Sequence, residues 1–115
     1  MTYKKWDIIL VPFPFTDQSN VKKRPALIIS PNSFNMNGPD IVIAFITSNI
    51  ESMSRTGDYI IKFWKQADLP KPSLLRMKFT SIDKKNILKR IGALVSEDIL
   101  NYQRELIKIL CLVPL

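Results

Sequence analysis

The sequence predicts one mainly β domain, a small and strongly curved barrel of short strands with a single helix at its C-terminal end. Three observations carry this prediction. Short apolar runs alternate with polar segments containing proline, glycine or asparagine as far as residue 94, and from residue 96 apolar residues recur at helical spacing. The 115 residues fit a single domain, and 46% hydrophobic with 23% charged residues is a globular composition.

Three strands are predicted in the first half of the chain. Residues 8–12 form the first, which Pro12 and Pro14 stop or confine to a sheet edge. The polar residues 15–23 predict a loop. Residues 25–30 form the second strand, whose continuous apolar run indicates burial on both faces. Residues 31–39, with three asparagines, predict another loop, and residues 40–47 form the third strand.

Three further strands are predicted in the second half. A polar linker over residues 49–57 leads to a fourth strand at 58–62, and the two prolines in residues 64–72 make that stretch irregular. Residues 73–79 form the fifth strand. Its alternation places Leu74, Arg76 and Lys78 on one face and Leu75, Met77 and Phe79 on the other. Residues 89–94 form a short last strand.

The C-terminal segment predicts a helix. Ser96 has the side chain of an N-cap, and Glu97 and Asp98 follow at the positive end of the helix dipole. Pro114 fits a stop near the end of the chain. One face is expected to pack inward, with apolar residues at helical spacing: Ile99, Tyr102, Leu106, Ile109 and Val113.

Charge and residue usage narrow the function classes. A net charge of +7 favours a polyanionic partner, chiefly nucleic acid, and also allows an acidic protein or an anionic membrane. The sequence contains no histidine, which excludes histidine acid–base catalysis and histidine metal sites, and we expect no metal and no cofactor. The single cysteine, Cys111, forms no intrachain disulfide. Without a signal-peptide pattern or a membrane-length apolar run, we expect a cytoplasmic protein that does not bind a membrane.

Five blocks, in order along the chain, carry a family resemblance: residues 6–17, 23–30, 43–48, 71–76 and 91–94. They resemble the PemK/MazF toxin family, whose first strand runs into a Pro-Phe loop and is followed by an Arg-Pro strand and by a strand ending in Thr-Ser. Two positions depart from the family. Trp6 stands where a glycine usually precedes the first-strand Asp7, and we expect little effect there. Lys78 stands where some members have an acidic residue, which argues against a carboxylate base at that point.

The resemblance implies a small SH3-like barrel of the PemK/MazF/CcdB kind, spanning residues 1–115 as one toxin domain of a type II toxin–antitoxin system. It implies sequence-selective, metal-independent cleavage of single-stranded RNA. It also implies a homodimer and inhibition by an antitoxin, which the charge of this chain suggests is acidic. Two alternatives remain. A gyrase-inhibiting toxin would share the fold and act on protein, and a non-catalytic barrel would bind RNA without cutting it.

Three residues are the catalytic candidates: Arg24, Thr47 and Arg76. At a loop–strand junction, the Arg24 guanidinium can form two parallel bonds to phosphate oxygens, although the Lys22-Lys23-Arg24 run can also be a solvated surface. The Thr47 hydroxyl can place a phosphate oxygen and the 2′-OH, or can simply cap a turn. The resemblance makes Arg24 catalytic and favours a role for Thr47. Arg76 matches the family's second arginine, and a phosphate ligand and an ordinary surface residue are equally good interpretations.

Six further residues are candidates for binding RNA: Phe15, Asp17, Lys22, Lys23, Ser48 and Lys78. The lysines supply charge for phosphates, and Phe15 flanks the loop that leads to them, where an aromatic ring can stack a base. Asp17 can also act as a general base, but the neighbouring lysines would lower its pKa, so the base stays unassigned. Ser48 can equally be a turn residue.

Overall fold

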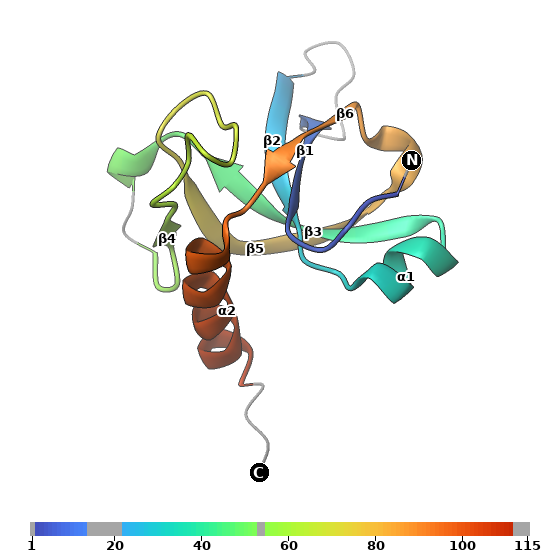
Figure 1. Ribbon diagram of the computed structural model, residues 1–115. Coiled ribbons are helices and arrows are strands. Elements are labelled where there is room, and N and C mark those ends of the chain that lie inside the picture. The colour runs from blue at the N-terminus through green and yellow to red at the C-terminus, as the bar shows by residue number, and fades with distance from the viewer. Residues whose placement is uncertain (1, 14–21, 53–54, 112–115) are drawn as a thin grey trace.

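The computed structural model describes residues 2–13, 22–52 and 55–111 and confirms a mainly β fold with a C-terminal helix (Figure 1). Its elements are β1 (Asp7–Phe13), β2 (Lys22–Ile28), α1 (Asn32–Asn37), β3 (Asp40–Thr47), η2 (Ile50–Ser52), β4 (Tyr59–Ile60), β5 (Leu74–Asp83), η3 (Lys84–Asn86), β6 (Lys89–Ala93) and α2 (Ser96–Leu110). The strands form one antiparallel sheet in the order β4-β5-β3-β2-β1-β6, curled into a half-barrel with α2 beside it.

Alternation along the central strands divides the buried residues between two cores. On β2, Leu27 points to one face while Ala26 and Ile28 point to the other, and none of the three is exposed. The first core packs under α2 and contains Ile8, Leu27, Ala44, Ile46, Ile61, Ala67, Leu69, Leu75, Leu94, Tyr102 and Leu106. The second core contains Ile9, Val11, Ala26, Ile28, Ile41, Ile43, Ile82 and Ile87. The expected burial of both faces of β2 is therefore confirmed.

The strand boundaries match the prediction at β3 and differ elsewhere. β1 continues through Pro12, because β6 pairs only with Asp7–Leu10 and leaves Pro12 bonded to β2 alone. β2 begins at Lys22 and ends at Ile28, so Arg24 lies inside a strand and not at a loop–strand junction. β4 is only two residues long, and β6 ends at Ala93, one residue early. β5 extends to Asp83, because pairing with β3 organises its polar end as well.

Two predictions near helices were wrong. Residues 31–39, predicted as a loop, contain the short helix α1. This helix is held by a polar contact, because the buried Asn35 side chain donates to the backbone oxygen of Ser30. A helix anchored in this way shows no apolar pattern in the sequence. The N-cap of α2 is Val95, with no side-chain capping bond, and Ser96 is the first helical residue. On the inward face of α2, Tyr102 and Leu106 are buried, whereas Ile109 is 39% exposed. Val113 and Pro114 lie outside the described residues.

Asp98, expected only to favour the helix dipole, ties α2 to the segment after β4. Its carboxylate is fully buried and accepts hydrogen bonds from the Tyr59 hydroxyl and from the backbone N–H groups of Lys62 and Phe63. Burial, together with the bond to Asp98, raises the pKa of Tyr59 to about 12, so this hydroxyl keeps its proton and acts as a donor. The helix therefore fixes the position of residues 59–63, which precede the loop beside the candidate site.

The structure explains the glycine that usually occupies the position of Trp6. The φ angle of Trp6 is 77°, in the left-handed region that glycine adopts without strain. Such a conformation costs a non-glycine residue about 1 kcal/mol. Two backbone bonds hold it there, from Trp6 N to the Ile28 oxygen at 2.7 Å and from Leu94 N to the Trp6 oxygen at 2.9 Å. The indole ring also packs against the first core, so the fold tolerates the departure at some cost.

Candidate active site

The candidate site lies where β2 and β3 stop pairing. The last pair towards this end of the two strands is Ala26–Phe45. The next two residues on the same face, Arg24 of β2 and Thr47 of β3, would come opposite each other if the ladder continued, but they are not paired. Arg24 remains paired with Val11 of β1, and Thr47 with Leu74 of β5. The two central strands therefore part at Arg24 and Thr47.

Alternation places the side chains of this site in line with the second core. On β1, Phe13 lies two residues beyond the buried Val11, and on β2, Arg24 lies two residues beyond the buried Ala26. On β3, Phe45 follows Ile43 in the same way. The apolar rows of three strands thus end in two aromatic rings and one guanidinium.

These ends surround a pocket of about 230 Å³, here called the first pocket. Its lining residues are Phe13, Arg24, Phe45, Ile46, Thr47, Arg55, Arg76 and Lys78. It brings together all three catalytic candidates and Lys78, although they come from three different strands. Arg55 is the residue that the sequence analysis missed. It is exposed in a loop without an apolar pattern, so nothing in the sequence distinguishes it from other surface arginines.

Arg24 is half-buried, and its Nε is buried without a hydrogen-bond partner in the described part of the chain. Its Cζ lies 5.6 Å from the centroid of the Phe13 ring, and Phe13 in turn packs edge-on against Phe45 with their centroids 5.3 Å apart. A guanidinium that lies beside an aromatic ring and has no acidic partner among the described residues has bonding capacity there for an anion. This environment differs from that of a solvated charge run.

An irregularity in β5 brings two cations to the same pocket. Ala44 pairs with Phe79 and Ile46 pairs with Leu75, so three residues of β5 lie opposite the single residue Phe45. Bulges of this kind change the direction of side chains beside functional sites. Arg76 and Lys78 both line the pocket as a result, and the Lys78 Nζ lies 5.5 Å from the centroid of the Phe45 ring.

The sequence left Arg76 as either a phosphate ligand or an ordinary surface residue, and the structure shows that it is not an exposed surface residue. Its Nη1 donates to Oδ2 of Asp58 at 2.8 Å, and the two side chains are only 12% and 2% exposed. The Tyr102 hydroxyl donates to the backbone oxygen of Arg76 at 3.1 Å, which also fixes this part of β5. Asp58, which the sequence analysis did not single out, compensates the charge of Arg76 and holds its guanidinium in place.

Thr47 caps a turn and also lines the first pocket, so its hydroxyl fits both interpretations made from the sequence. Its Oγ1 accepts a hydrogen bond from the backbone N–H of Asn49 at 3.2 Å, which is the turn-capping arrangement. The hydroxyl proton can still be donated, and the side chain lines the first pocket beside Arg24. Capping therefore fixes the orientation of a hydroxyl that faces the pocket.

A second pocket of about 180 Å³ adjoins the first. Its lining residues are Lys23, Arg24, Pro25, Ile46, Ser48, Pro70, Lys71 and Ser73. Two of the RNA-binding candidates, Lys23 and Ser48, lie here, whereas the exposed Lys22 lines neither pocket. Phe15 and Asp17 lie outside the described residues. Within the described part, no helix is both long and apolar enough to cross a membrane.

The half-barrel with its C-terminal helix has the fold of solved MazF structures. The chain belongs to the PemK-like, MazF-like toxins of type II toxin–antitoxin systems, whose family model matches residues 4–110. Cleavage of RNA at specific sequences is typical of this family. None of the curated proteins gives a significant match.

Solved structures share the fold at low sequence identity. A MazE–MazF complex from Deinococcus radiodurans is 14% identical with a TM-score of 0.77, covering 98% of this chain and 99% of that chain. An endoribonuclease in complex with its cognate antitoxin from a mycobacterial species is 14% identical with a TM-score of 0.75, covering 99% and 97%. The Mycobacterium tuberculosis toxin MazF-mt6 is 16% identical with a TM-score of 0.71, covering 89% and 93%.

Proposed function

We propose that this toxin is an endoribonuclease that cuts single-stranded mRNA in the cytoplasm and so arrests translation. The observation that carries the proposal is the first pocket, in which the half-buried Arg24 lies beside Thr47 and two further cations, Arg55 and Lys78. Cations next to the rings of Phe13 and Phe45 suit an unpaired RNA strand, whose phosphates and bases need different partners. The family, whose members cut RNA, supports the same activity.

The reaction that fits these groups is attack by the RNA's own 2′-OH. Its oxygen bonds to phosphorus, the bond from phosphorus to O5′ breaks, the 2′-OH proton leaves and O5′ gains a proton. The products are a 2′,3′-cyclic phosphate and a 5′-OH. Arg24 stabilises the charge on the phosphorane, and the Thr47 hydroxyl orients the phosphate. Arg76, whose guanidinium is held by Asp58, lines the first pocket and supplies a positioned positive charge there. No base is assigned; Asp17 is one candidate.

Cleavage should not require a metal ion, because the cations of the first pocket supply the positive charge that metal ions supply in other nucleases. We expect the pure protein to cut single-stranded RNA in EDTA at its full rate and to leave cyclic phosphate ends. Gel analysis of the fragments, with and without phosphatase treatment, checks both statements. Complete loss of activity on chelation, restored by Mg²⁺, would refute the mechanism, and intact RNA in every buffer would favour the gyrase-type or non-catalytic alternative.

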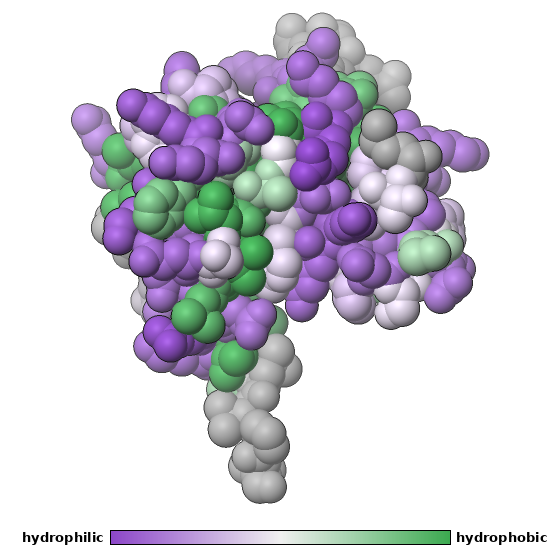
Figure 2. Space-filling model, viewed as in Figure 1, coloured by the Kyte–Doolittle hydropathy of each residue, from purple (hydrophilic) through white to green (hydrophobic). Residues whose placement is uncertain are grey.

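An acidic antitoxin and a second copy of the chain are the partners that the surface suggests. Exposed apolar side chains lie on α2, where Leu100 is 49% and Leu110 46% exposed, and Figure 2 shows hydrophobic residues gathered over this helix. An isologous dimer would cover such residues. The net charge of +7 favours a segment rich in Asp and Glu, which could lie across the pockets and block both Arg24 residues of a dimer.

Two measurements test these partners. Light scattering at micromolar concentration should give about twice the chain mass of 13.3 kDa. The product of the neighbouring reading frame should bind, should abolish cleavage when saturating, and should bind less tightly as salt rises. A monomeric mass would refute the proposed dimer. Full cleavage activity in the saturated complex would refute the proposed inhibition by an antitoxin.

A further inference from the structure

The two pockets lie on opposite faces of the sheet. The first pocket is lined by Phe13, Phe45 and Thr47, which point to the face of the second core. The second is lined by Lys23 and Pro25, which alternate with Arg24 along β2 and therefore point to the other face, and by Ser48, which follows the end of β3. The pockets meet where β2 and β3 part.

Of the residues that the structure describes, only Arg24 and Ile46 line both pockets. Arg24 therefore forms the wall between them, and its Nε is buried there without a partner in the described part of the chain. A phosphate bound to Arg24 would have one pocket on each side. The sugars and bases that it joins would then enter different pockets.

The second pocket has the chemistry of a nucleotide site. Pro25, Ile46 and Pro70 provide an apolar surface on which a base can lie. The exposed Ser48 offers a hydroxyl to the base edge. Lys23 and Lys71, both exposed, supply charge for a neighbouring phosphate. Among the described residues, two aromatic side chains line the first pocket and none lines the second, so within this part of the chain the two sides would read bases by different contacts.

We propose that the two nucleotides flanking the scissile phosphate are unstacked and enter these two pockets on opposite faces of the sheet, with Lys71 contacting a phosphate on the side of the second pocket and Lys78 one on the side of the first. The inference rests on the proposed function, and it gives a physical reason why RNA cleavage would be accelerated. In stacked RNA the 2′-oxygen, phosphorus and O5′ are not in line. Separating the neighbouring bases turns the backbone at that phosphate and allows the in-line approach. The Arg24 wall would be the point of the turn.

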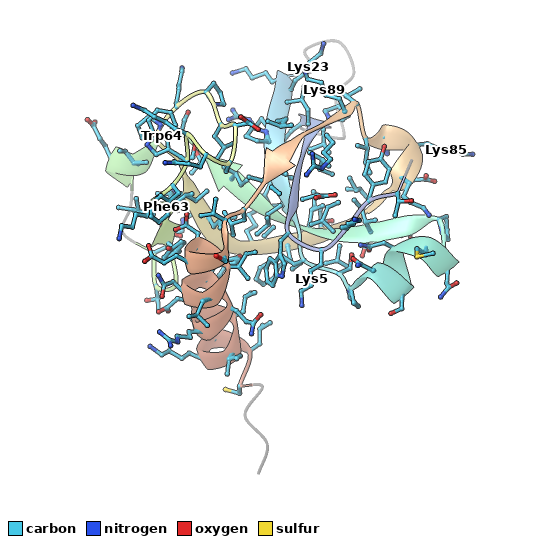
Figure 3. The ribbon with its side chains drawn as sticks, in the orientation of Figure 1. Lys5, Lys23, Phe63, Trp64, Lys85 and Lys89 are labelled. Carbon is cyan, nitrogen blue, oxygen red and sulfur yellow. The ribbon has the colours of Figure 1, made fainter. Side chains whose placement is uncertain are left out.

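The test uses an uncleavable RNA and three matched lysine variants. The cut site of the wild-type protein is first mapped by sequencing, and a 2′-deoxy sugar then replaces the attacking one. A 2-aminopurine base, whose fluorescence rises when it is unstacked, is placed on each side of the cut in turn. Binding and fluorescence are compared for Lys71→Ala, Lys78→Ala and Lys85→Ala. Lys71 lines only the second pocket and Lys78 only the first, while Lys85 lies away from Lys23 at the far end of the molecule (Figure 3).

We expect the fluorescence of both probes to rise on binding to the wild type. Lys71→Ala should reduce the rise for one probe only, and Lys78→Ala for the other. Each should weaken binding about three- to tenfold, as expected for the loss of one phosphate contact, while Lys85→Ala changes neither quantity. Probes that stay quenched, or Lys71→Ala behaving like Lys85→Ala, would overturn the inference. If the wild-type protein cuts no RNA, no cut site can be mapped. That result would overturn both the proposed function and the inference.

Discussion

Replacing Arg24 with alanine should lower kcat/KM for RNA cleavage at least about a hundredfold, since losing one charge contact made in the transition state costs on the order of 3 kcal/mol. Arg24 lines both pockets and has no hydrogen bond at its buried Nε within the described residues. Within the described part of the chain, the bonding capacity of this Nε is thus not used by the fold. Initial rates on a short RNA containing the mapped cut site measure the effect.

The same variant should stay folded. Among the described residues, the side-chain interaction that Arg24 loses is its contact with the Phe13 ring, worth roughly 0.5–1 kcal/mol. Thermal unfolding should therefore change little while activity disappears. Arg24→Lys should recover only a small part of the rate, because an ammonium group cannot form two parallel bonds to phosphate. A folded Arg24→Ala protein that cuts RNA at the wild-type rate would show that Arg24 has no catalytic role.

Replacing Gly92 with alanine should destabilise the fold by about 3 kcal/mol, at the upper end of the cost of overpacking. A Cβ at Gly92 would lie 2.2 Å from the backbone oxygen of Ala67 and 3.0 Å from its carbonyl carbon. Backbone atoms cannot rotate away as a side chain would. β6 and the segment around Ala67, which contributes to the first core, would have to separate.

Gly38→Ala is the matched control. No atom lies within 4 Å of a Cβ at Gly38, and its φ of −149° suits any residue. Its free energy of unfolding should stay within about 0.5 kcal/mol of the wild type. Urea unfolding of both variants measures the difference. Equal stability of the two variants would mean that the close approach at Gly92 can relax without cost.

Much of the fold is determined by local sequence patterns. The alternating and continuous apolar runs placed β3 correctly at Asp40–Thr47 and located β1, β2, β5 and β6. Helical spacing placed α2, and two of its inward residues, Tyr102 and Leu106, are buried as expected. These signals are strong because each depends on which face of a single strand or helix is buried, and that is periodic in the sequence.

The catalytic candidates could be named from the sequence because they lie in or beside predicted strands and match family blocks, but their environment could not be predicted. Asp58 and Arg76 are 18 residues apart in the chain, so their buried ion pair depends on how β4 and the loop before it pack beside β5. Arg55 and Lys71 lie in loop segments without periodicity. Only the way in which these loops pack against the curled sheet brings the two residues to the pockets.

The sequence by itself determined that this chain is a basic, mainly β domain with a C-terminal helix, and its resemblance to the family made Arg24 and Thr47 the leading candidates. Only the tertiary structure decided that Arg24 lies within a strand, at the wall between two pockets. That position arises because β2 and β3 stop pairing after Ala26–Phe45. The parting of two strands is a long-range property, since it depends on the sheet around them and leaves no pattern in either strand.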